Sequence, residues 1–167
     1  MVSMRARTRE LWSEHNPGLD TSPMEVVAQV KRVVAALDRA VAPLYEGAAL
    51  TAAEVELLVP LRHADEPVTA SGLAFRLGMS RAGVSKALAK MERRGLIARS
   101  VNPADRRAAL ISLTATGEDA IDQLFPRELA AHAQVLAGLG SDRQRVVDAL
   151  ARLAEVMEAH LDADAER

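Results

Sequence analysis

Cysteine is absent from this chain of 167 residues, and aromatic side chains are scarce, with one Trp, one Tyr and two Phe. A fold without cysteine has no disulfide and no thiol-based redox sensor. Long apolar runs are missing as well, because no stretch reaches the roughly 18 residues that a membrane-spanning helix needs. The N-terminal segment lacks the apolar run of a signal peptide. We therefore expect a cytoplasmic protein with no membrane partner.

Groups suited to metal binding or catalysis are also few. The four histidines, His15, His63, His132 and His160, are scattered, and no two stand at the i, i+3 or i, i+4 spacing of a helical metal site. The chain has no glycine-rich phosphate loop, and its serines and histidines are not placed to form a nucleophile and its base. We expect no metal, no cofactor and no enzymatic activity.

Charge is present in quantity but unevenly distributed. Residues 69–107 contain nine Lys or Arg against Glu92 and Asp105, a net charge of +7, whereas residues 24–68 and 108–167 carry −3 and −6. Such a basic block is either a solvated face or a surface for nucleic acid, and charge alone leaves both interpretations open. The abundance of alanine, in a chain that is 49% apolar, favours helices packed through small residues.

Helix start signals define the N-terminal part. Ser22, Pro23 and Glu25 form the pattern of an N-cap, a first-turn proline and a capping box, so we predict a helix from Pro23 to near Glu46. Thr51 and Glu54 form a second capping box at the start of the next helix. Pro60 falls inside that helix and should kink or shorten it. The arm before Asp20 is predicted to be irregular or a short helix.

The basic block predicts a winged helix-turn-helix. Thr69 caps one short helix, Gly78 interrupts it, and Ser80 caps a second helix with Val84, Leu88 and Met91 on one face. Segments 96–101 and 108–114 then alternate as two short strands joined by NPADRRA. Arg106 and Arg107 therefore stand at the tip of the hairpin.

The C-terminal part is predicted to be helical again. One helix begins at Thr114 or Thr116 and runs towards Leu139, interrupted by Pro126, and Ser141 caps the last helix. The fold class is thus mainly α with a small β-hairpin wing. We expect an N-terminal arm and dimerisation helix over residues 1–50, the winged helix-turn-helix over 51–114, and C-terminal dimerisation helices over 115–167. The first and last helices have long apolar faces that so small a core cannot cover, which favours a homodimer.

The run from Ser80 to Gly117, SRAGVSKALAKMERRGLIARSVNPADRRAALISLTATG, resembles the MarR family of bacterial transcription regulators. The family has a serine-capped recognition helix, then Leu-Glu-x-x-Gly-Leu-Ile/Val-x-Arg, then Asp-x-Arg-x-x-x-Leu/Val-x-Leu-Thr-x-x-Gly. The chain has MERRGLIAR, with Met91 in the leucine place, followed by DRRAALISLTATG. The resemblance implies a homodimer with interlocked terminal helices and a winged helix-turn-helix on each side, acting as a transcriptional regulator and usually a repressor.

That resemblance assigns roles in binding double-stranded DNA. The recognition helix would enter the major groove of a pseudo-palindromic operator, with Arg81 bidentate to guanine. Arg107 would enter the minor groove, and Asp105 would orient the wing by pairing with an arginine. The other candidate DNA-binding residues are Thr69, Ser71, Ser80, Ser85, Lys86, Lys90, Arg93 and Arg106. Lys90 could equally be an ordinary solvated lysine, and the two wing arginines could simply keep the tip soluble.

Family members commonly respond to small anionic or phenolic effectors. The arm carrying Trp12 is similar to that of a urate-responsive subgroup, in which a Trp, an acidic residue and an arginine form the site. Trp12 and Glu56 match the first two positions, but Ala87 stands in the place of the arginine. Only the location of a ligand site is therefore carried over, and Trp12 and Glu56 could instead be a packing residue and a solvated residue.

A second class of function is compatible with the same fold. A winged helix-turn-helix can be a protein-interaction module that no longer binds DNA. Such a module would have acidic or apolar residues on the exposed face of its recognition helix and a neutral wing. The chain has basic residues in both places, which favours DNA binding.

Overall fold

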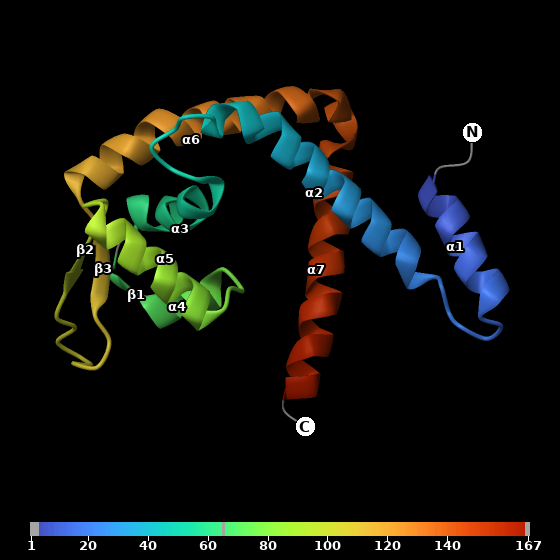
Figure 1. The fold of residues 1–167 in the computed structure, drawn as a ribbon, viewed down its shortest axis with the longest axis horizontal. Coiled ribbons are helices and arrows are strands. Elements are labelled where there is room, and N and C mark those ends of the chain that lie inside the picture. Colours follow the sequence, from blue (N-terminus) through green and yellow to red (C-terminus); the bar gives the residue numbers. More distant parts are fainter. Residues whose placement is uncertain (1–3, 65, 166–167) are drawn as a thin grey trace. The chain divides into compact units, whose positions relative to one another are not determined.

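Helices dominate the computed structural model, which describes residues 4–64 and 66–165, and a small antiparallel sheet lies among them (Figure 1). The helices are α1 (Met4–His15), α2 (Pro23–Tyr45), α3 (Ala52–Arg62), α4 (Ala70–Arg76), α5 (Arg81–Arg93), α6 (Ala115–Leu136), the 3₁₀ segment η1 (Ala137–Asp142) and α7 (Arg143–Ala165). The strands are β1 (Val68–Thr69), β2 (Ile97–Ser100) and β3 (Leu110–Leu113). The predicted fold class is confirmed. The chain divides into two compact units, Met1–His132 and Ala133–Arg167.

Two helix starts test the capping predictions. At α3 the capping box is present, because Thr51 Oγ1 accepts from the Glu54 amide at 3.3 Å and Glu54 Oε2 accepts from the Thr51 amide at 3.0 Å. At α2 the predicted box is wrong. Ser22 is already helical, at φ −59° and ψ −36°, and its side chain caps nothing, while Asp20 Oδ1 accepts from the Ser22 amide at 2.9 Å. Glu25 pairs instead with Arg9 of α1, at 3.0 Å.

The predicted interruption at Pro126 is wrong, because α6 runs through that residue. Helix α3 includes Pro60 and ends two residues after it, at Arg62. Proline removes a single backbone hydrogen bond, and Ile121 and Leu124, which precede Pro126, anchor α6 in the core while Pro126 lies on the solvent side. The predicted cap at Ser141 is also wrong, because that residue lies within η1 and α7 begins at Arg143.

The sheet has the order β1-β3-β2, with both pairs antiparallel. Strands β2 and β3 form the predicted hairpin, in which Ile97 pairs with Leu113 and Arg99 with Ile111. Strand β1 adds a third strand on the other side of β3, through Val68 opposite Ile111. It contains only two residues, too few for an alternating pattern to be recognised, so the sequence did not predict it.

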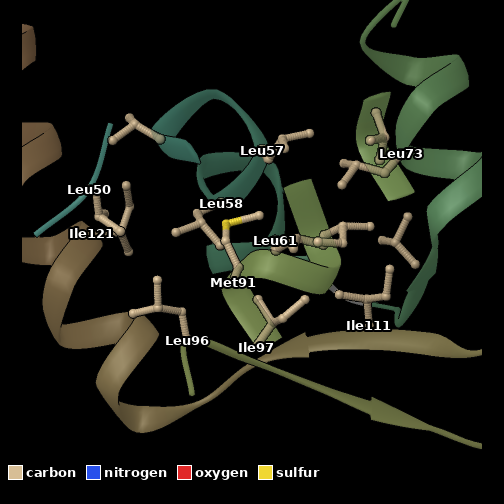
Figure 2. Packing of buried hydrophobic residues seen from close by; sticks show 14 of the residues in the cluster. Leu50, Leu57, Leu58, Leu61, Leu73, Met91, Leu96, Ile97, Ile111 and Ile121 are labelled. Carbon is tan, nitrogen blue, oxygen red and sulfur yellow. The ribbon is translucent and has the colours of Figure 1, made fainter. Parts of the chain in front are cut away.

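The core lies between α3, α4, α5 and the sheet (Figure 2). Val84, Leu88 and Met91 of α5 are fully buried, which confirms the face predicted from their spacing. Burial of each such side chain stabilises the fold by roughly 1.5–3 kcal/mol. The other large buried side chains include Leu50, Leu57, Leu58, Leu73, Ile111 and Ile121. This core holds α5 by one face and leaves its opposite face to the solvent.

Helix α6 is attached to the same core at several points along its length. Arg62 at the end of α3 makes a bidentate pair with Asp122, with distances of 2.8 and 2.7 Å. The hydrogen bonds between the two side chains raise the pKa of Arg62 and lower the pKa of Asp122. The Tyr45 hydroxyl donates to Glu128, and burial together with that bond raises the pKa of Tyr45.

Candidate nucleic-acid interface

The helix-turn-helix is built by α4, a glycine turn and α5. The Thr69 hydroxyl accepts from the Gly72 amide and the Ser80 hydroxyl from the Gly83 amide, each at 3.1 Å. Both predicted caps are therefore confirmed. Gly78, which follows α4, has φ +60°, a backbone conformation that glycine adopts without strain.

Helix α5 presents a polar face opposite its buried one. Arg81, Ser85, Lys86 and Arg93 are all exposed. By helical spacing Lys86 and Arg93 lie directly opposite Val84, Leu88 and Met91, and Ser85 lies between the two faces. Arg81 lies nearer the buried face by the same spacing, and it is exposed as the first residue of the helix. This is the geometry expected of a helix that is packed on one side and free to enter a groove with the other.

The wing tip is shaped by two short side chains. Asn102 Oδ1 accepts from the Ala104 amide at 3.0 Å, and Asp105 Oδ1 accepts from the Arg107 amide at 2.9 Å. The Ala108 amide also donates to the Asp105 carbonyl, at 3.1 Å. Asp105 therefore orients the loop through the backbone, and the predicted pairing with an arginine side chain is absent from the residues the structure describes. Arg106 and Arg107 are both exposed.

Three other basic residues of the block are engaged with acids. Arg99 of β2 binds Glu92 of α5 at 2.9 Å, which ties the base of the wing to the recognition helix. Lys90 and Arg94 both reach Glu54 at the start of α3, at 3.2 and 2.6 Å. Burial alone would raise the pKa of Glu54, but hydrogen bonds from Arg94, the Thr51 amide and Lys90 outweigh it and hold the pKa at about 2. The paired residues are seven to forty positions apart in the sequence, so no local motif predicts these ion pairs.

The candidate effector residues lie on separate helices. Trp12 on α1 is half-exposed, and Glu56 on α3 is exposed. Within the described residues no hydrogen bond or ion pair joins them. An open depression of about 340 Å³ beside α1 is lined by Arg9, Glu10, Ser13, Glu14 and Thr21, without Trp12. The described residues contain no group of three or more potential metal ligands, and none of the described helices is long and apolar enough to cross a membrane.

Comparison with known proteins finds similarity to one family of transcriptional regulators. The sequence profile of the MarR family matches residues 50–108, which span the helix-turn-helix and reach into the wing. The HTH-type transcriptional regulator PecS of Dickeya dadantii is 26% identical over 141 residues, or 83% of this chain and 85% of that protein.

Solved structures agree over a larger part of the chain. The MarR family regulator AbsC of Streptomyces coelicolor superposes with a TM-score of 0.68 at 24% identity, covering 84% of this chain and 97% of AbsC. The transcriptional repressor CouR bound to a 23-mer DNA duplex gives 0.64 at 26% identity, covering 80% and 92%. CouR of Rhodococcus jostii RHA1 bound to p-coumaroyl-CoA gives 0.60 at 26% identity, covering 78% and 90%. Residues 50–108 thus match the MarR family, and most of the chain is similar in sequence or structure to transcriptional regulators.

Proposed function

We propose that the chain is a homodimeric repressor that binds pseudo-palindromic operator DNA and is released by a small anionic or phenolic effector. The observation that carries the DNA-binding part is the state of its cations. Arg81, Lys86 and Arg93 on α5, with Arg106 and Arg107 on the wing, are exposed and have no acidic partner among the residues described. Unpaired cations on one surface repel each other, and phosphates relieve that repulsion.

The recognition helix supplies the sequence specificity in this proposal. Its N-terminal part lies in the major groove, where the planar fork of Arg81 matches the two acceptors of guanine. Ser80 and Ser85 border that contact. Lys86 and Arg93 bind phosphates, which adds affinity and salt dependence without sequence information. Lys90 is a weaker phosphate candidate than its position suggested, because its ammonium lies at Glu54.

The wing and α4 hold the DNA on either side of that helix. Arg107 enters the minor groove, where the negative potential is strongest, and Arg106 contacts the flanking backbone. The bond from the Arg107 amide to Asp105 gives the loop a defined shape at that residue. Thr69 and Ser71, at the start of α4, offer hydroxyls and helix N-terminal amides to a phosphate.

Dimerisation is supported by one apolar stripe on α2. At its C-terminal end Val41 is buried and Leu44 packs against the core of the same chain, whereas Val26, Val30 and Val33, further up the stripe, are 39–49% exposed. Helix α7 likewise exposes Val147, Leu150, Val156, Met157 and Leu161. A second copy covers both faces in this proposal. The two recognition helices of the dimer then contact half-sites about 34 Å apart on one side of the duplex.

A structural neighbour supports release by an effector. CouR has been solved with p-coumaroyl-CoA and with a DNA duplex, so a fold of this kind accommodates both a ligand and DNA. Trp12 supplies an aromatic surface and Glu56 a polar group near the helices that would form the dimer. We propose these two residues as part of the effector site.

The first test is a titration of the purified protein against the intergenic DNA upstream of its own gene, at two salt concentrations. We expect tight, salt-sensitive binding with a footprint of two half-sites. An equally tight complex with random DNA would contradict the specific role of α5. No affinity for any duplex would contradict the whole proposal. Candidate phenolic and anionic compounds can then be screened for release of the same complex.

A further inference from the structure

Glu54 is the one buried charged side chain among the residues that the structure describes, with 5% of its side chain exposed. It lies outside the surface that would face DNA. Burial of a carboxylate destabilises a fold unless each of its oxygens is paired. The partners of Glu54 therefore indicate which segments it joins. Two of those partners belong to the recognition helix.

The partners of Glu54 come from two separate segments. One oxygen, Oε2, accepts from the Thr51 amide at 3.0 Å and so belongs to the start of α3. The other, Oε1, accepts from Arg94 Nη1 at 2.6 Å and lies 3.2 Å from Lys90 Nζ, both at the C-terminal end of α5. The second arm of the Arg94 fork, Nη2, donates to the carbonyl of Ala49. One arginine thereby joins α5 to α3 and to the segment that follows α2.

We propose that Glu54 is a positioning residue for DNA recognition, which acts through Arg94 to set the orientation of α5 and through Lys90 to withhold a cation from the DNA. This inference deepens the proposed function and rests on it. The packed core fixes one face of α5 but allows a helix to rotate or slide by a fraction of a turn. The two-armed Arg94 contact fixes its C-terminal end, and with it the angle at which Arg81 would meet a base edge.

The consequence concerns specificity more than affinity. A direct base contact depends on the helix lying in one orientation, whereas phosphate contacts tolerate a shift because backbone oxygens line the groove on both sides. Loss of the Glu54 carboxylate also releases Lys90, whose side chain is already 56% exposed, towards phosphates. Specific binding should therefore weaken while non-specific binding stays equal or becomes stronger.

The test uses Glu54→Gln, which preserves the size of the side chain and removes its charge, and Arg94→Lys, which preserves the charge but not the two-armed contact. Glu46→Gln is the matched control, since Glu46 is an exposed carboxylate just after α2. The probes are a duplex selected from a random pool by the unmodified full-length protein and a scrambled duplex of the same composition. The measured quantity is the ratio of the two dissociation constants for each variant.

For Glu54→Gln and Arg94→Lys we expect the ratio to fall about tenfold, the size of one lost base contact. For Glu46→Gln we expect no change. An unchanged ratio in Arg94→Lys, or an equal loss of both affinities in a less stable Glu54→Gln, would overturn the positioning role. If Glu54→Gln does not fold, Arg94→Lys decides alone. Failure of the unmodified protein to enrich any duplex would instead contradict the proposed function.

Discussion

Two kinds of basic residue are mixed in the segment from residue 69 to 107, and only their contacts separate them. Lys90, Arg94 and Arg99 are bound to acids of the same chain. Arg81, Lys86, Arg93 and the two wing arginines project without such partners among the residues described. A net positive charge in the sequence therefore overstates the number of cations available to DNA. Only the cations without an acidic partner are available to bind phosphate.

The unpaired arginines should differ in what they contribute. We expect Arg107→Ala to weaken binding to all duplexes alike and to reduce the slope of log affinity against log salt by about one. Arg81→Ala should instead relax the preference at one position per half-site, at a cost of roughly 1–3 kcal/mol for the preferred sequence. Titrations of each variant against the operator, single-base variants and random DNA at several salt concentrations measure both effects. Equal losses on all duplexes in both variants would show that the assignment of roles is wrong.

Glu54 makes the stability of the fold depend on pH in the acid range. Its pKa is lowered from 4.5 to about 2, so the folded state holds the carboxylate ionised where the unfolded chain takes up a proton. The stabilisation is fully present above pH 4.5 and is lost as the pH falls towards 2, by an amount on the order of 3 kcal/mol. Urea unfolding of the protein and of Glu54→Gln at pH 7, 4.5 and 3 measures it. The gap in unfolding free energy between the two proteins should narrow below pH 4.5, and a constant gap would contradict this account.

At the scale of elements, the junction between the wing and α6 is tightly packed. The Thr114 hydroxyl accepts from the Gly117 amide at 3.1 Å and donates to the Gly95 carbonyl at 2.6 Å. Gly117 is buried against the backbone of Leu96, and Leu113 Cδ2 would lie 3.2 Å from a Cβ at this position. The glycine is required because a backbone passes where a side chain would be.

Gly117→Ala should accordingly destabilise the first unit. The added methyl group would overlap the Leu96 carbonyl, which belongs to the strand and loop backbone and has little freedom to move. We expect a loss of about 3 kcal/mol in the free energy of unfolding, measured by urea denaturation. Gly138→Ala is the control, because nothing lies within 4 Å of a Cβ at that glycine. Similar stability of the two variants would mean that α6 can move away from Leu96 at little cost.

Helix starts agree with the prediction where the capping side chain and its amide partner are close in sequence. Thr51, Thr69 and Ser80 cap their helices as predicted, because each cap is formed within three residues. The Ser22 side chain makes no cap, and the Ser22 amide instead donates to Asp20, two residues earlier. Pro126 failed as a helix breaker because Ile121, Leu124 and Phe125, which precede it, pack α6 against the core and Pro126 itself is exposed. These outcomes depend on neighbours that a local pattern does not contain.

At the scale of the whole molecule, the exposed valines of α2 carry the proposal of a dimer. Val30 stands at the middle of that stripe and is 39% exposed in the single chain. If a second copy covers it, a carboxylate there would be buried without a partner in both subunits. We expect Val30→Glu to weaken the dimer by roughly a hundredfold or more and to abolish tight operator binding.

Sedimentation velocity over a range of protein concentrations, with a DNA titration in parallel, measures both changes. Ala35→Glu is the matched control, because it adds the same charge to an exposed position of the same helix, away from the stripe. A Val30→Glu protein that remains dimeric would place the subunit contact elsewhere, and α7 would be the next surface to vary.

The amino-acid sequence by itself determined the order and type of most elements, the buried face of α5, the wing and the resemblance to the MarR family. These features depend on short-range periodicity, helix caps and turns, because the interactions that form them involve residues a few positions apart. Only the tertiary structure decided which cations are free, which carboxylate is buried, where β1 pairs and why Gly117 must be a glycine. Those features depend on residues brought together from distant segments, such as Glu54 and Arg94, and packing of the whole unit chooses among many such pairings that are equally compatible with the sequence.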